Sequence, residues 1–293
     1  MKTSRCHLAL IFSFAILSQN CVSPDSLSDN PDHTPRTHIF QPERPIPYPV
    51  DIPDAFHAAI EAGTRSLDGR PGSAYWQNYA FYELHALLNP ATHRIHGTAN
   101  IRYQNNSPDD LELLVFELAQ NLHKEGTPKM DITEITGGKT LSRVSVNGDE
   151  LTPVTMEERW LRGKSGYLNE GTQLYLFPES PLLSGEEMEF EFEWSFQVPE
   201  RGASGRMGRS RENLYFIAYW YPHIAVYDDV HGWFTDPFLG NAEFYHGFAD
   251  YTLTVTAPAE WLVMGTGDFL NPEEVLREPF LERYSLAGSS DEP

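Results

Sequence analysis

The chain has 293 residues and carries 42 acidic side chains against 21 basic ones, which gives a formal net charge of -21. So large a negative charge argues against nucleic acid and anionic lipid surfaces as partners. The length allows one large domain or two of medium size, each with a substantial core. Because only two cysteines occur, Cys6 and Cys21, a disulfide framework and a zinc site built from thiolates are excluded.

The first twenty residues have the layout of an export signal. Lys2 and Arg5 precede an apolar run, residues 8–17, and polar residues follow it. Ten residues of helix span only about 15 Å, against roughly 30 Å of bilayer hydrocarbon, so this run is too short for a transmembrane anchor. We therefore expect residues 1–20 to direct export to the bacterial cell envelope, either to the periplasm or to the outer membrane.

Cys21 lies directly behind this signal. That position is typical of bacterial lipoproteins, in which the cysteine becomes the first mature residue and is acylated. Ser18 and Asn20 stand where such signals usually have leucine and a small residue, so ordinary secretory cleavage nearby is the alternative. We expect lipid attachment at Cys21, with membrane contact only through that anchor.

The next segment, residues 21–53, is rich in proline, serine and aspartate. This composition predicts a tether or a surface strap without regular structure. Residues 54–62 then favour one short helix, with Asp54 as its N-cap and Gly63 as its stop.

Beyond Tyr79 the hydrophobic period is two, which is typical of strands with one wet face. Residues 80–88 and 95–103 alternate in this way and predict a hairpin, and Asn147-Gly148 is a type I′ turn signal. In the clearest strand, residues 188–198, apolar side chains point to one face and glutamates to the other.

The remaining strand signals complete the predicted fold. Shorter apolar runs lie at residues 111–118, 132–135 and 174–177, and the alternation over residues 250–258 is expected to bury Tyr251, Leu253 and Val255. Many short strands with little helix indicate an all-β, antiparallel sandwich or saddle-like sheet over residues 54–270. A polar tail, residues 271–293, follows.

No motif for catalysis is present. No histidine in the chain is followed by glutamate, so the His-Glu-x-x-His zinc helix is missing, as are a nucleophile elbow and a phosphate loop. His93 and His96 are three residues apart at a predicted turn-to-strand junction and point to opposite faces, so they cannot share a metal ion. The sequence thus predicts no catalytic residue, no metal ligand and no cofactor in this chain.

An arginine-rich loop stands out on so acidic a protein. Residues 199–213 contain four arginines separated by glycines: Arg201, Arg206, Arg209 and Arg211. Such a loop is either an anion-binding site or a solvated hairpin loop. We favour the solvated loop, because nothing in the sequence directs the guanidinium groups to a common point.

Residues 214–248 form the densest patch of aromatic, acidic and imidazole side chains. Its members are Tyr219, Trp220, Tyr221, Trp233 and Phe234, with Asp228, Asp229, His231, Asp236, Glu243 and His246. The patch is a metal site, a surface for a peptide amine or a sugar, or an edge that packs on a neighbouring domain. Because the spacing matches no known ligand frame, the last two interpretations are favoured.

Several segments, in one order, resemble the bacterial aminopeptidase N-like zinc metallopeptidases. They are DGRPGSAYWQ at residues 68–77, LNP…HG at 88–97, YQNNSP at 103–108, AYWYPHIAVYDDVHGW at 218–233, FLGNAEFY at 238–245, and DYTLTVTAP…GTG at 250–267. Together the similarity covers about residues 66–290.

This resemblance implies an N-terminal β-saddle domain, which in the family precedes a thermolysin-like domain that holds Zn²⁺. The full enzyme would remove N-terminal residues from peptides, with the missing catalytic domain as the partner of this non-catalytic portion. The resemblance also implies that Tyr219, Trp220 and Tyr221 form a wall of the substrate cleft. The family usually has glutamine at the position of Tyr219, so its contact with substrate is not carried over.

A protein of another class is the alternative. The chain would then be a free-standing exported β-sandwich lipoprotein that binds peptides or glycans through the aromatic patch at residues 214–248. A complete domain of this kind should be a soluble monomer, whereas a portion of a larger enzyme should leave apolar surface exposed and self-associate.

Overall fold

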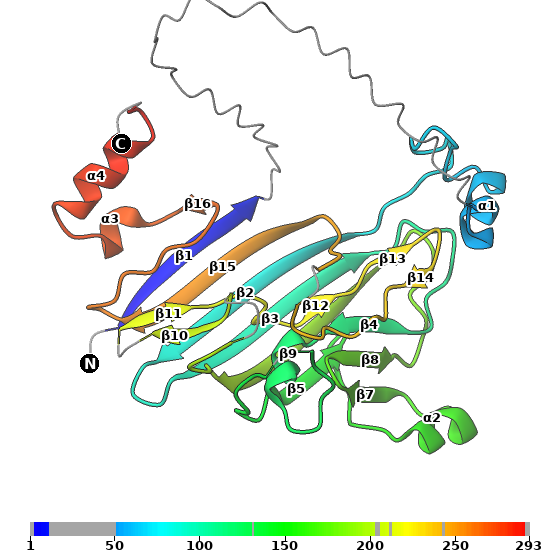
Figure 1. Cartoon of the computed structure of the whole chain (residues 1–293), viewed down its shortest axis with the longest axis horizontal. Helices are drawn as coiled ribbons and strands as arrows, with labels where there is room; N and C mark the ends of the chain where they lie inside the picture. The colour runs from blue at the N-terminus through cyan, green and yellow to red at the C-terminus, as the bar shows by residue number, and fades with distance from the viewer. Residues whose placement is uncertain are drawn as a thin grey trace, which may run out of the picture.

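The computed structural model describes residues 3–11, 51–130, 132–202, 206–210, 213–241 and 244–290. Its larger sheet has eight strands (Figure 1), in the spatial order β16 (Asp268–Phe269), β1 (Thr3–Ile11), β15 (Ala249–Pro258), β2 (Tyr79–Asn89), β3 (Arg94–Gln104), β9 (Glu187–Gln197), β5 (Thr140–Val146) and β6 (Asp149–Glu150). The expectation of an all-β fold is confirmed.

A second sheet of four strands packs beside the first, in the order β12 (His223–Ile224), β4 (Leu114–Glu117), β8 (Gln173–Phe177) and β7 (Gly166–Glu170). Two small ribbons pair β10 (Gly208–Ser210) with β11 (Leu214–Phe216) and β13 (Tyr227–Asp228) with β14 (Gly232–Trp233). The helices are α1 (Asp54–Glu61), the 3-10 helix η1 (Ala119–His123), α2 (Met156–Arg162), α3 (Pro272–Val275) and α4 (Phe280–Ala287).

The centre of the large sheet follows the period-two pattern. Along β3, every second residue from Ile95 to Tyr103 is buried, and the residues that alternate with them are exposed. β2 and β3 pair as the predicted hairpin, and β9 buries its apolar face as expected. Asn147 and Gly148 have φ values of 50° and 87°, so the turn between β5 and β6 has the left-handed conformation at both central residues that a type I′ turn requires.

The core lies between the two sheets. Phe116 of β4 meets Phe190 and Phe192 of β9 edge to face, with ring centroids 5.1 and 5.0 Å apart. All three side chains are at most 1% exposed. Each such burial contributes roughly 1.5–3 kcal/mol, so these rings are a main connection between the layers.

β15 differs from the sequence-based expectation in two ways. It runs parallel to β2, whereas the expected sheet was antiparallel throughout. This arrangement is possible because β15 enters the sheet after a long excursion of the chain and not through a hairpin. Tyr251 is buried as expected, but Leu253 and Val255 are only half-buried, and Thr254 is the buried residue between them.

Two local predictions need correction. α1 begins at Asp54 itself and its N-cap is Pro53, so Asp54 lies in the first turn and does not cap the helix; there its charge suits the helix dipole. Residues 132–135 form no strand, and Ile132 is fully exposed. A short apolar run is an ambiguous strand signal, because periodicity over so few residues does not fix the structure.

Near the chain start, residues Thr3–Ile11 form β1, which pairs with β15 on one side and β16 on the other. These residues belong to the predicted export signal. The predicted lipid-attachment residue, Cys21, and most of the predicted tether lie outside the described residues. Among the residues that are described, no helix combines the length and the apolar character that crossing a bilayer requires.

Candidate functional site

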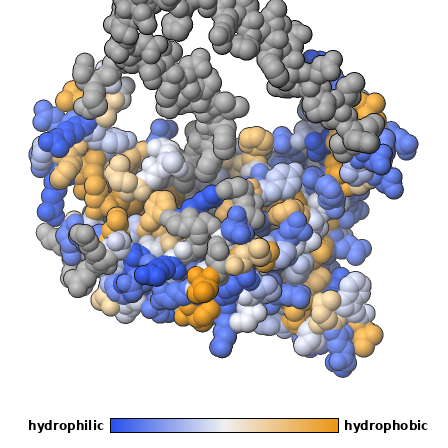
Figure 2. All heavy atoms as spheres, viewed as in Figure 1, coloured by the Kyte–Doolittle hydropathy of each residue, from blue (hydrophilic) through white to orange (hydrophobic). Residues whose placement is uncertain are grey.

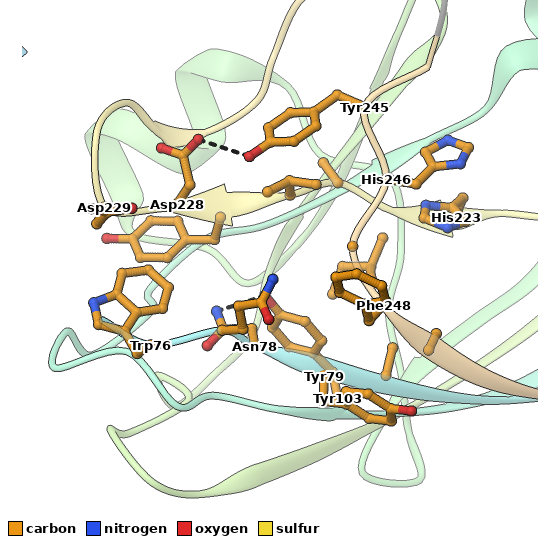
Figure 3. A pocket seen from close by; sticks show the side chains of 18 of the residues that line it. Trp76, Asn78, Tyr79, Tyr103, His223, Asp228, Asp229, Tyr245, His246 and Phe248 are labelled. Atoms are coloured by element: carbon orange, nitrogen blue, oxygen red, sulfur yellow. Dashed lines mark hydrogen bonds between the residues drawn. The ribbon is translucent and has the colours of Figure 1, made fainter. Parts of the chain in front are cut away.

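A cavity of about 270 Å³ opens at one end of β2, where several distant segments meet. Its lining comes from the segment before β2, from β3, from the stretch that contains β12 and β13, and from the residues that lead into β15. Figure 3 draws 18 of the lining side chains and labels ten of them: Trp76, Asn78, Tyr79, Tyr103, His223, Asp228, Asp229, Tyr245, His246 and Phe248.

Aromatic rings form one side of this cavity. Trp76 stacks on Tyr227 with ring centroids 5.8 Å apart, and Tyr227 in turn contacts Trp233 at 5.2 Å. Tyr245 packs edge-on against Phe234 at 5.6 Å. Flat aromatic surfaces of this kind suit the faces of sugars, rings and peptide side chains.

Amide groups give the cavity fixed polar points. The Asn78 side chain donates to the Tyr103 hydroxyl over 2.8 Å, and its carbonyl oxygen accepts from the backbone N–H of Asn106 over 2.7 Å. Asn78 therefore has both ends of its amide engaged, which fixes the orientation of the group.

Two adjacent aspartates at the rim have different roles. Asp229 is nearly buried and forms a two-pronged pair with Arg65, with Nη2–Oδ1 and Nε–Oδ2 distances of 2.5 and 2.9 Å. Burial alone would raise the pKa of Asp229, but the Arg65 hydrogen bonds outweigh it, and the pKa lies below its ordinary value. Asp228 is half-buried, and its Oδ1 atom accepts from the backbone N–H groups of Val230 and His231. It does not take part in the Arg65 pair, so its negative charge is the less neutralised of the two.

The phenols beside these acids are hydrogen-bond donors. Tyr245 donates to Asp228 over 3.2 Å, as Figure 3 shows, and Tyr227 donates to Asp109 over 2.9 Å. Burial, together with the neighbouring carboxylates, raises the pKa of Tyr227 and of Tyr245 to about 12. Both phenols are consequently protonated at neutral pH.

The other end of the cavity holds two stacked imidazoles. The rings of His223 and His246 lie 3.9 Å apart between centroids, and His246 Nε2 is 3.1 Å from Glu117 Oε2. Burial first, and then the neighbouring His246, lower the pKa of His223 well below its ordinary value. His223 is therefore neutral at physiological pH.

The three aromatics expected at a cleft wall do not line this cavity. Tyr219, Trp220 and Tyr221 are half-buried and pack on the core: Trp220 contacts Trp194 at 5.9 Å, and Tyr221 contacts Tyr82 at 5.6 Å. Tyr219 has a φ of 35°, an uncommon value for a non-glycine residue.

The rest of the patch at residues 214–248 is divided between cavity and surface. Asp228, Asp229 and His246 line the cavity, whereas Asp236 and His231 are exposed outside it. Glu243 lies outside the described residues. The structure therefore brings together only part of the predicted constellation.

The arginine-rich loop includes the β10–β11 ribbon. Arg209 lies 3.8 Å from Glu200, and the backbone N–H groups of Glu200 and Arg201 donate to Glu134. Arg211 lies outside the described residues.

Sequence reasoning missed several residues of the site, above all Glu117, which lies beside the cavity residue His246. A signal for Glu117 was present, because it is the only charged residue in the apolar stretch LLVFEL, residues 113–118. Burying a lone carboxylate in a strand costs free energy unless a hydrogen-bonding or cationic partner compensates for its charge. Trp76 and Asn78 lie in the segment before β2, which has no hydrophobic periodicity. Their place in the cavity is therefore seen only in the folded chain.

No family model matches this sequence, and no curated protein matches it either. Among solved structures, the M1 zinc metallopeptidase of Deinococcus radiodurans matches with 13% identity over 46% of this chain and 23% of its own, at a TM-score of 0.29. A two-domain M1 zinc metallopeptidase variant bound to L-arginine matches with 14% identity over 64% of this chain and 34% of its own, at a TM-score of 0.33. This chain spans between about a quarter and a third of the length of those proteins. The likeness is partial and is no basis for assigning an activity.

Proposed function

We propose that this chain is the N-terminal, non-catalytic portion of an aminopeptidase N-like zinc metallopeptidase, and that its cavity forms part of the peptide-binding cleft. One observation carries the proposal. Three segments that resemble the family, residues 68–77, 218–233 and 238–245, each contribute side chains to the same cavity. The first of these segments is far from the other two in sequence, and the fold brings all three to one cavity.

The chemistry of the cavity fits the N-terminal amine of a peptide. Asp228 supplies a carboxylate, and the aromatic faces of Trp76 and Tyr227 supply an apolar surface for the first side chain. An ammonium group beside a half-buried carboxylate is a charge-assisted pair, which is stronger than a neutral hydrogen bond. The His-Glu-x-x-His ligands that hold the family's zinc are absent from these 293 residues, so we derive no hydrolytic step for this chain.

Peptide binding can be tested by titration with intrinsic tryptophan fluorescence. A tripeptide with a free amine should bind, whereas its N-acetylated form should bind at least about tenfold more weakly. The acetylated form lacks the positive charge that pairs with the Asp228 carboxylate. D228N should abolish this difference. D236N, a change at an exposed aspartate outside the cavity, should leave it intact.

The non-catalytic assignment has its own assay. The chain alone, supplied with zinc, should not hydrolyse an aminoacyl reporter substrate. Measured turnover by a homogeneous preparation would contradict this part of the proposal. Reading the coding DNA beyond codon 293 is a second test, because a frame that continues with the His-Glu-x-x-His motif supports the proposal and an unrelated neighbour opposes it.

A second candidate function is glycan binding by a free-standing exported domain. The stacked pair of Trp76 and Tyr227, with the Asn78 amide nearby, has the composition of a sugar site. An oligosaccharide series in the same titration separates the two functions. Saturable binding of a sugar, with no preference for free amines, would favour the glycan-binding domain.

A further inference from the structure

We propose that Glu117, His223 and His246 form a binding site for a divalent transition metal ion, for which zinc is the best-fitting probe. One ligand atom from each residue lies within 4.8 Å of the others. Two imidazoles and one carboxylate are a donor set that zinc takes in proteins, with a further position left for water or a ligand. The sequence spacing predicted no metal ligand in this chain, because the three residues come from separate segments.

A strand pair holds two of the three ligands. Glu117 of β4 and His223 of β12 are direct partners in antiparallel register, and they are 8% and 6% exposed. Directly opposed residues have their Cβ atoms about 4.5–5.5 Å apart, so both side chains start from neighbouring points. A dication would also offset the free-energy cost of the buried Glu117 carboxylate.

His223 supplies an independent observation. Its Nδ1 atom is buried and has no hydrogen-bond partner among the described residues, while its Nε2 atom lies 3.3 Å from the Tyr251 hydroxyl. A metal-bound histidine usually has one nitrogen on the ion and the other held by a hydrogen-bonding group. His223 therefore has the second nitrogen engaged and the first one available.

His246 is the ligand that has to move. Its ring stacks on His223 at an interplanar angle of 22°, so it must turn out of the stack to direct a nitrogen to the same ion. Ligand atoms about 2 Å from zinc lie roughly 3–3.5 Å from one another, so the widest separation must shrink by about 1.5 Å. The exposed, irregular segment before β15 permits this movement, and both histidines line the cavity, which gives an ion a route from solvent.

Zinc titration of the full, chelator-treated chain by calorimetry tests the site, with the visible absorption of Co²⁺ as a second probe of the ligand set. The chain should bind one equivalent. H246A and E117Q should each weaken binding by about 100-fold or more, which is beyond the effect of changing an outer-shell partner. The matched control is H231A, at a side chain that is 72% exposed and outside the cluster, and it should bind as the parent does.

Failure of the parent chain to take up zinc overturns the proposal. The proposal is also overturned if H246A binds zinc with the same affinity as H231A. His246 is exposed, so H246A should remain folded, as circular dichroism can verify, and this variant decides the matter if E117Q does not fold. The inference is independent of the proposed function, since zinc uptake and peptide binding are measured separately.

Discussion

At the scale of single residues, the fold places several polar groups where burial sets their chemistry. Lys139 is a clear case: it is 5% exposed, and its Nζ atom has no hydrogen-bond partner among the described residues. The ammonium lies 5.2 Å from the centre of the Trp194 ring. Burial lowers the pKa of Lys139 well below its ordinary value, because desolvation penalises the charged form.

Replacing this lysine should therefore stabilise the protein. K139M keeps the length of the side chain and removes the buried, unpartnered amino group, so at pH 7 it should raise the free energy of unfolding by roughly 1–3 kcal/mol. Chemical denaturation measures the change. K124M, at an exposed lysine nearby, should have almost no effect, and equal effects from the two variants would contradict the explanation.

The same group predicts a pH dependence of stability. The unfolded chain keeps Lys139 protonated up to an ordinary pKa of about 10.4, whereas the folded chain loses that proton at lower pH. Between these two pKa values the unfolded state binds more protons, so stability rises as pH rises. The gain between pH 7 and pH 9 should be smaller in K139M than in the parent, as denaturation curves at both pH values would show.

At the scale of elements, the long strands depend on close packing between neighbours. Gly97 of β3 faces Trp194 of β9 in register, and the indole ring covers the space where a side chain would be. A Cβ atom added to Gly97 would lie 2.3 Å from an atom of that ring. The glycine at this position is therefore required by the tryptophan on the next strand.

G97A should accordingly destabilise the sheet. Moving Trp194 costs the overpacking penalty of about 1–3 kcal/mol, which should appear as a lower midpoint in chemical denaturation with an unchanged slope. G247A is the matched control, because a Cβ atom there meets nothing within 4 Å. Equal denaturation midpoints for the two variants would contradict this explanation, because they would show that the Trp194 ring can move without loss of stability.

At the scale of the whole molecule, one edge of the large sheet depends on the first residues of the chain. β1 covers the outer edge of β15 over nine residue pairs. Exposed apolar side chains occur in the chain after β15, namely Leu262, Met264, Leu270, Phe280 and Leu286, and Figure 2 shows apolar side chains over this end of the molecule. Removal of residues 1–20 as an export signal would leave the β15 edge open.

The chain without residues 1–20 should therefore self-associate, because an open strand edge is a template for another strand. Size-exclusion chromatography with light scattering should detect dimers or larger species. T252K places a charge on the β15 edge and should shift the population toward monomer. T98K adds the same charge to a strand inside the sheet and should leave the population unchanged. If the shortened chain is a monomer, the β15 edge is not exposed and the prediction is wrong.

Local sequence was sufficient for much of the architecture. The alternation in β3 and β9 predicted which side chains are buried, and Asn147-Gly148 predicted its turn, because each signal involves only neighbours along the chain. The parallel pairing of β15 with β2 could not be predicted in that way. It depends on where a distant segment enters the sheet, and no periodicity records that choice.

The candidate site belongs almost entirely to the tertiary structure. The sequence by itself determined that residues 214–248 concentrate aromatic, acidic and imidazole groups. Only the fold decided that Trp76 joins Tyr227, or that Glu117 joins His223 and His246. The physical reason is that strand pairing brings together residues far apart in sequence, whereas hydrophobic pattern and turn chemistry act over a few residues.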